Sequence, residues 1–163
     1  MKFSEMVYTR PDYPAVPKEL EALTQKLSGA KSSQEQVAIY KECETLLSHL
    51  ETQTTLCYIR HSVNTRDSFY EAENDYNDQQ APFVTEKAQE FTKALLESPF
   101  RAELEKALGS LLFQNLELEQ KGFSPEIVPL MQEENKLSSD YQKLYASAQI
   151  PFMGKTVTVA QLG

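Results

Sequence analysis

Apolar residues recur at helical spacing along most of this chain, which predicts a protein built from packed helices. Ser32 and Glu35 stand at the spacing of a capping box, in which the Ser side chain caps a helix and the Glu side chain reaches back. The residues behind this box alternate steps of three and four over three heptads, which predicts one long helix packed against a neighbour. The seam of this helix is formed by Tyr40, Cys43, Leu47, Leu50, Thr54, Cys57 and His61.

Prolines and a second capping residue delimit the helices on either side of the long one. Pro17 suits the first turn of a short helix that carries three leucines and ends near Gly29. Asp67 is placed to cap the helix after the long one. We expect that helix to stop before Pro82, because the residue before a proline disfavours helical geometry. A separate helix then follows, with an apolar face formed by Val84, Ala88, Phe91 and Leu95.

Two Ser-Pro pairs and a glycine divide the second half of the chain. Ser98 and Ser124 each precede a proline at the start of a predicted helix, and Gly109 predicts a stop or kink between them. Pro129 delays the regular part of the last helix by about a turn. Glu134 lies on the apolar seam of that helix, so its carboxylate either has a partner or stays hydrated. The seam is formed by Ile127, Leu130, Leu137, Tyr141, Leu144 and Ala148.

The hydrophobic period changes from helical to alternating at Gln149. Met153 and Gly154 are placed to form a turn between two short strands, which predicts a β-hairpin with one apolar face. The sequence therefore predicts an all-α fold, an antiparallel array of long helices over residues 1–148, with a C-terminal β-hairpin over residues 149–163. The apolar face of this hairpin is formed by Ile150, Phe152, Val157 and Val159.

The chain is acidic, which narrows the classes of partner. Its 24 Asp and Glu residues outnumber its 16 Lys and Arg residues, for a net charge of −8 over 163 residues. Phosphate binding needs clustered cations, so this charge argues against a nucleic-acid partner. No apolar run approaches the roughly 20 residues that span a bilayer, and the first residues show no signal-peptide pattern. We therefore expect no membrane partner and a cytoplasmic location.

Cys43 and Cys57 are the only cysteines. On one helix they lie about 21 Å apart, whereas a disulfide needs Cα atoms within about 7 Å, so we expect two reduced, buried thiols. Cys57 and His61 are four residues apart on one helical face, which is the spacing of a possible thiol–imidazole nucleophile. Because both lie on an apolar seam, a buried thiol beside a satisfied histidine is the commoner outcome.

The histidines do not form a recognisable metal motif. Neither His49 nor His61 begins a His-Glu-x-x-His zinc motif, and neither completes the Glu-x-x-His motif of di-metal bundles. On one helix they stand about 18 Å apart. The acidic run 71–78 lacks the glycine and the terminal Glu of a calcium loop. We therefore predict no catalytic residue and no metal ligand in this chain, and a solvated or seam-edge position for His49.

Four segments resemble the oligoendopeptidase F family of zinc peptidases, and they occur in the order of that family. Residues 59–75, IRHSVNTRDSFYEAEND, resemble its junction between the second and third helices, and residues 98–105, SPFRAELE, resemble its next junction. Residues 133–150 are similar to the last helix and strand of its N-terminal domain, and residues 154–163 to the hairpin and the turn that follows. The similarity covers essentially the whole chain, but none of these segments is catalytic in the family.

This resemblance implies the N-terminal part of a zinc-dependent peptidase that hydrolyses short peptides. The helices would form a wall that restricts access to a channel, while a missing catalytic domain would supply the zinc and the base. The hairpin residues Ile150, Phe152, Val157 and Val159 would pack against that domain, their partner in the intact enzyme. The chain alone would hold no zinc and would be inactive. A free-standing helical module that binds partner helices is the alternative.

Overall fold

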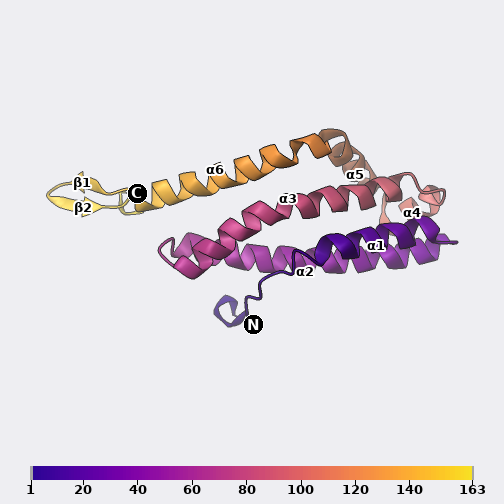
Figure 1. Ribbon diagram of the computed structural model, residues 1–163, viewed down its shortest axis with the longest axis horizontal. Coiled ribbons are helices and arrows are strands. Elements are labelled where there is room, and N and C mark those ends of the chain that lie inside the picture. The colour runs from indigo at the N-terminus through magenta and orange to yellow at the C-terminus, as the bar shows by residue number, and fades with distance from the viewer. Residues whose placement is uncertain (1, 163) are drawn as a thin grey trace.

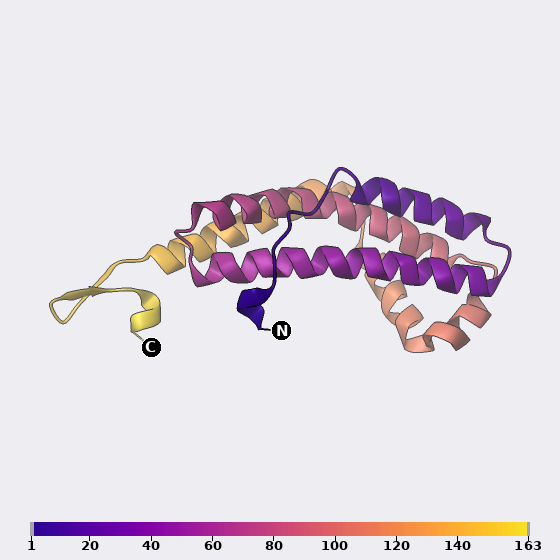
Figure 2. The same cartoon turned by 90° about the horizontal axis from the view of Figure 1, so that it is seen from below.

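The computed structural model describes residues 2–162 and contains six α-helices followed by a two-stranded hairpin (Figure 1). The long helices α2 (Ser33–Val63) and α3 (Ser68–Leu96) run antiparallel, and α1 (Val16–Gly29) packs against both (Figure 2). No helix within the described residues is long and apolar enough to cross a membrane. The predicted all-α array with a terminal hairpin is confirmed. The remaining elements are α4 (Arg101–Leu108), α5 (Ser110–Gly122), α6 (Val128–Ser147), β1 (Ile150–Phe152) and β2 (Lys155–Val157).

The predicted capping residues hold the starts of α2 and α3. Ser32 accepts a hydrogen bond from the backbone nitrogen of Glu35 at 3.2 Å, and the Glu35 carboxylate accepts one from the backbone nitrogen of Lys31 at 2.7 Å. Asp67 accepts from the backbone nitrogen of Phe69 at 3.0 Å. The first N–H groups of a helix have no intrahelical acceptor, so each such cap stabilises the fold by about 0.5–2 kcal/mol.

The hydrophobic core lies where α1 packs on α2 and α3. Leu20 of α1 and Leu95 of α3 are almost completely buried in it, and burying a side chain of this size contributes about 1.5–3 kcal/mol. α4 packs against α2 and α5 against α3, so Leu104 and Phe113 extend the core at one end of the array. Gly109, with φ of 101°, separates α4 from α5, as the sequence predicts.

The helix that was expected to stop before Pro82 continues through it, so that expectation is wrong. Residues 68–96 form the single helix α3, with Pro82 inside it. Proline has no N–H to donate to the carbonyl four residues earlier, which belongs to Asp78. Asn135 of α6 donates to the Asp78 carbonyl oxygen at 3.2 Å, and Gln132 donates to the neighbouring Gln79 carbonyl at 2.8 Å. Donors from another helix therefore satisfy the backbone where the proline interrupts α3.

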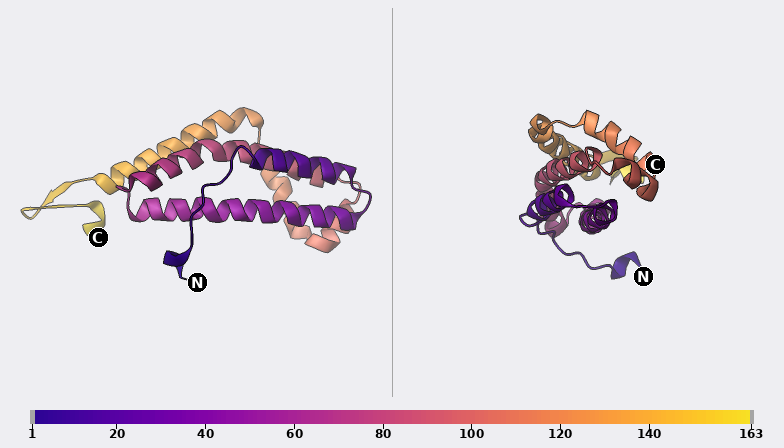
Figure 3. Two further views of the ribbon diagram at one scale, coloured as in Figure 1. Left: turned by 60° about the horizontal axis from the view of Figure 1, so that its bottom comes forward. Right: turned by 90° about the vertical axis from the view of Figure 1, so that its right-hand side faces the viewer.

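α6 packs along α3 (Figure 3), and its polar side chains contact that helix. Ser139 donates to the Asp78 carboxylate, and Lys143 Nζ lies 2.8 Å from the nearest Asp75 oxygen. Glu134 is exposed, in agreement with a hydrated carboxylate. The apolar seam predicted for this helix therefore does not face the array, because the opposite side of α6 provides the hydrogen bonds that α3 needs. The large seam residues are exposed by 62% at Leu130, 60% at Leu137, 65% at Tyr141 and 71% at Leu144.

The predicted turn at Met153 and Gly154 joins the two strands. Their φ angles of 49° and 75° lie in the left-handed region, which suits a tight hairpin turn. The strands pair antiparallel, with Ile150 opposite Val157. The hairpin extends past the end of α6 instead of folding back over the helices (Figure 1). Gly163, the last residue of the predicted hairpin segment, lies outside the described residues.

Candidate functional site

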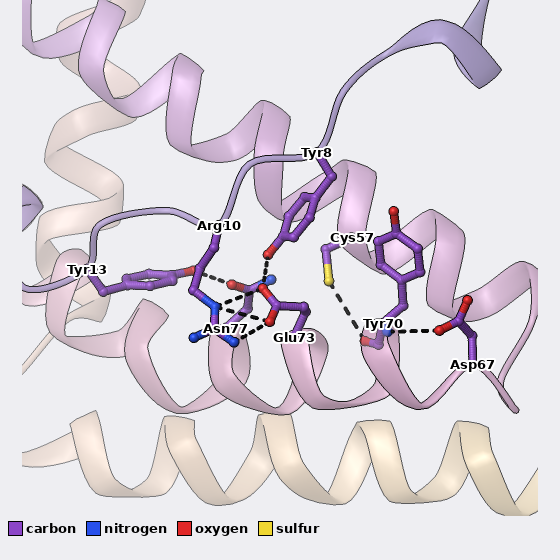
Figure 4. A network of polar contacts seen from close by, with 8 residues as sticks. All are labelled: Tyr8, Arg10, Tyr13, Cys57, Asp67, Tyr70, Glu73 and Asn77. Carbon is purple, nitrogen blue, oxygen red and sulfur yellow. Dashed lines mark hydrogen bonds and ion pairs between the residues drawn. The ribbon is translucent and has the colours of Figure 1, made fainter.

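A polar network attaches the N-terminal arm, residues 2–15, to α3 (Figure 4). Arg10 Nε donates to the two carboxylate oxygens of Glu73 at 3.1 and 3.0 Å, and its Nη2 atom makes a further short contact with the same group. The Tyr8 hydroxyl donates to Glu73 Oε2 at 2.7 Å. Glu73 is only 3% exposed, and a carboxylate remains charged in such a place only when donors surround it. Hydrogen bonds from Arg10 hold the pKa of Glu73 below its ordinary value, although burial opposes this effect.

Two further contacts extend the network, one along α3 and one to α2. The Tyr13 hydroxyl donates to Asn77 Oδ1 at 3.1 Å, and the backbone nitrogen of Thr9 donates to Gln53 Oε1 of α2 at 2.8 Å. This network was not predicted from the sequence, because the acidic run 71–78 was considered only as a calcium loop. Glu73 and Asn77 are four residues apart and share one face of α3, which was the available signal. The network anchors the arm to α2 and α3.

Cys57 and His61 are core residues. Cys57 is fully buried, and its sulfur lies 3.9 Å from the Tyr70 carbonyl oxygen. Burial raises the pKa of Cys57 to about 11 and that of Cys43 to about 12, so both thiols stay protonated at neutral pH. The prediction of two free, buried cysteines is confirmed. His61 is also buried, but neither ring nitrogen has a hydrogen-bond partner among the described residues, so the expectation of a satisfied histidine is wrong.

Metal-ligating side chains do not cluster in the part of the chain that the structure describes. Within residues 2–162, no group of three or more His, Cys, Asp or Glu side chains is arranged to hold a metal ion. His49 is exposed on α2, whereas His61 is buried twelve residues further along the same helix. A groove of about 490 Å³ between α3 and α6 is acidic, with Asp75, Asp78 and Asp140 in its lining. Burial raises the pKa of Asp78 in this groove, although the hydrogen bond from Ser139 opposes the shift.

The structure brings three of the four predicted hairpin residues together. Ile150 and Phe152 lie on one face of β1, and Val157 shares that face because it pairs with Ile150. Phe152 pairs with Lys155 and is 49% exposed. Val159 begins the 3₁₀ turn after β2, so it does not belong to the strand face on which it was predicted. β2 ends at Val157, so the alternation of side chains between the two faces of the hairpin ends before Val159.

Comparisons with known proteins agree with this architecture. Residues 3–123 match the family described as Peptidase M3 N-terminal domain. The solved structure of PZ peptidase A with inhibitor 2 matches with a TM-score of 0.95 and 41% identity, over 99% of this chain and 29% of that chain. A structure of oligoendopeptidase F from Bacillus anthracis strain Ames matches with a TM-score of 0.94 and 39% identity, over 99% of this chain and 30% of that one. No curated protein sequence matches significantly.

These matches confirm the resemblance stated from the sequence. The chain spans less than a third of the length of the solved peptidases that it matches. Three quarters of its residues lie within the family match, and the structural similarity continues through α6 and the hairpin. The chain therefore belongs to the peptidase M3 family, and it corresponds to the N-terminal domain of an oligoendopeptidase F.

Proposed function

We propose that this chain is the helical wall of a zinc-dependent oligoendopeptidase and that it restricts access to a channel in the intact enzyme. The observation that carries this proposal is the match to PZ peptidase A along 99% of this chain at a TM-score of 0.95. A match of that extent includes the hairpin and every helix described here, and not only one common helix pair. Short peptides are the proposed substrates, because a narrow channel admits a short unfolded chain and excludes a folded protein.

The construction of the helical array suits a wall. α2 has 31 residues and α3 has 29, which makes each about 45 Å long. The N-terminal arm crosses both helices and is fastened by Gln53 and Glu73. Buried apolar contacts and buried hydrogen bonds raise the free energy of local opening. A wall needs this rigidity, because a surface that opens easily would admit bulky substrates.

The zinc ligands and the general base are proposed to lie in the part of the peptidase beyond this match. Zinc held by those residues would supply a Lewis acid for the scissile carbonyl and for the attacking water. This chain would contribute shape and interdomain contact. Ile150, Phe152 and Val157 form the hairpin face proposed to pack against the catalytic domain, and Phe152 is the largest side chain available there.

A chimera tests this proposal. The matched 29% of PZ peptidase A is replaced by this chain, and intact PZ peptidase A is the control. We expect the chimera to hydrolyse a quenched fluorescent short peptide, to lose activity with a chelator, and to leave a folded protein uncut. A chimera that melts cooperatively and retains zinc but cleaves no short peptide would contradict the proposal. Cleavage of the folded protein by the chimera alone would contradict the role as a wall.

A further inference from the structure

α6 exposes a row of large apolar side chains, interrupted by Glu134, on the side that faces away from α3. We call this row the outward stripe: Leu130, Leu137, Tyr141 and Leu144, which are between 60% and 71% exposed. Leu137, Tyr141 and Leu144 form its longest uninterrupted part, and each is at least 60% exposed. Monomeric proteins rarely expose a contiguous apolar patch of more than a few hundred Å², and larger ones mark interaction sites.

Hydrogen bonds fix the orientation of α6, so the stripe cannot turn inward. Asn135 and Gln132 donate to the Asp78 and Gln79 carbonyls near the proline of α3, and Lys143 pairs with carboxylates of α3. Rotation of α6 by half a turn would put leucine side chains opposite these acceptors and leave them unpartnered. The stripe therefore remains exposed for as long as α6 packs on α3.

The spacing of the stripe is that of a seam between two helices. From Leu130 the seam passes through Glu134, Leu137 and Tyr141 to Leu144, in alternating steps of four and three residues. Such steps keep side chains on one side of a helix and form the holes into which a partner helix inserts. The seam is about 21 Å long, which accommodates about four turns of a second helix.

We infer that the outward stripe docks an apolar helix from the part of the peptidase beyond this match, an inference that rests on the proposed function. About seven tenths of PZ peptidase A lies outside the match and can supply this helix. The hairpin follows directly on the end of α6 that carries Leu144 (Figure 1). The stripe and the hairpin face proposed to contact the catalytic domain are thus carried by neighbouring elements of the chain.

The chemistry of the stripe favours this occupant over a second copy of the chain. Glu134 lies within the stripe, and burying its carboxylate requires a cation. The stripe itself carries no cation, so stripe-to-stripe contact between two copies would leave Glu134 unpaired. Two copies would also each carry a net charge of −8, which opposes association. The docking helix is therefore expected to combine an apolar face with a Lys or Arg that reaches Glu134.

The labelling rate of a cysteine introduced into the stripe measures whether the stripe is buried. This measurement does not depend on catalytic activity. Leu144→Cys is compared with Leu118→Cys, a control on α5 at a position with 66% exposure. The native Cys43 and Cys57 are buried and give little background. Maleimide labelling is measured in the isolated chain and in the chimera, after subtraction of the rate for the chimera without an added cysteine. We expect Leu144→Cys to react at least about tenfold more slowly in the chimera than in the isolated chain. The control should react rapidly in both.

Three other outcomes separate the docking site, its occupant and the proposed function from one another. Equal labelling of Leu144→Cys in the isolated chain and in a folded, active chimera would overturn the docking site but leave the proposed function intact. Slow labelling in the isolated chain, together with a dimer in sedimentation, would show that a second copy covers the stripe and would overturn the assignment of the occupant. Protection of Leu144→Cys in a zinc-loaded but inactive chimera would support docking and contradict the proposed function.

Discussion

The continuation of α3 through Pro82 is expected to depend on Asn135. Pro82 has no N–H to offer the Asp78 carbonyl, and Asn135 Nδ2 donates to that oxygen at 3.2 Å instead. Asn135→Ala leaves a partly buried carbonyl without this donor, so we expect it to lower the free energy of unfolding by about 1–3 kcal/mol. In a Pro82→Ala background, residue 82 regains an N–H within α3. The same Asn135→Ala change should then cost less than about 0.5 kcal/mol.

The double-mutant cycle isolates this effect from the other consequences of changing Pro82. Replacing a proline inside a helix by alanine favours the helix by about 3 kcal/mol. The Pro82 ring is fully buried, however, and its removal also forfeits packing. The gain in helix propensity and the loss of packing both accompany Pro82→Ala whether residue 135 is Asn or Ala, so they cancel in the cycle. The coupling energy between the two positions is therefore expected to be about 0.5–3 kcal/mol, a magnitude typical of residues that interact.

Urea unfolding followed by circular dichroism measures the four free energies of this cycle. Asn115→Ala on α5 is the matched control, because Asn115 is exposed, and its cost should stay within about 0.5 kcal/mol in both backgrounds. An equal cost of Asn135→Ala with proline and with alanine at position 82 would refute the reasoning. The Asp78 carbonyl would then not be the group that Asn135 satisfies.

Four further outcomes follow from the structure. Because the pKa of Glu73 is depressed, its carboxylate stabilises the fold above about pH 4.5, and this stability is lost as the pH falls through the folded-state pKa. Urea unfolding at several pH values should show that Glu73→Gln lacks this acid dependence. Identical pH profiles for the two proteins would contradict the prediction. Cys43 and Cys57 should react slowly with a thiol reagent in the native state and rapidly in denaturant, and rapid native labelling would show that they are not buried. Phe152→Ser should change self-association or solubility but lower the free energy of helix unfolding by less than about 0.5 kcal/mol. The core control Phe113→Ala should lower it by about 3–5 kcal/mol. A large loss at Phe152 would place the hairpin in the helical core. Metal analysis and a quenched-peptide assay should find no tightly bound zinc and no turnover in the isolated chain, and stoichiometric zinc with chelator-sensitive turnover would contradict this.

The features that the sequence predicted correctly depend on neighbours within a few residues along the chain. Ser32 and Asp67 cap helices because their side chains reach N–H groups two or three residues ahead. Gly109 breaks a helix and Gly154 completes a turn because both adopt positive φ angles. The family resemblance was likewise carried by contiguous segments. The sequence by itself therefore determined the helical class, most helix boundaries and the lineage.

Tertiary structure decided the features whose partners lie far away in the sequence. Pro82 would end an isolated helix, but Asn135, which follows it by 53 residues, provides a donor for the carbonyl that the proline leaves free. The same contacts turn the polar side of α6 inward and its apolar seam outward, against the orientation that amphipathicity alone predicts. Glu73 is buried because the side chain of Arg10, 63 residues earlier, reaches it. A single sequence records such residues but not their proximity, because only the folded chain brings donor and acceptor within hydrogen-bonding distance.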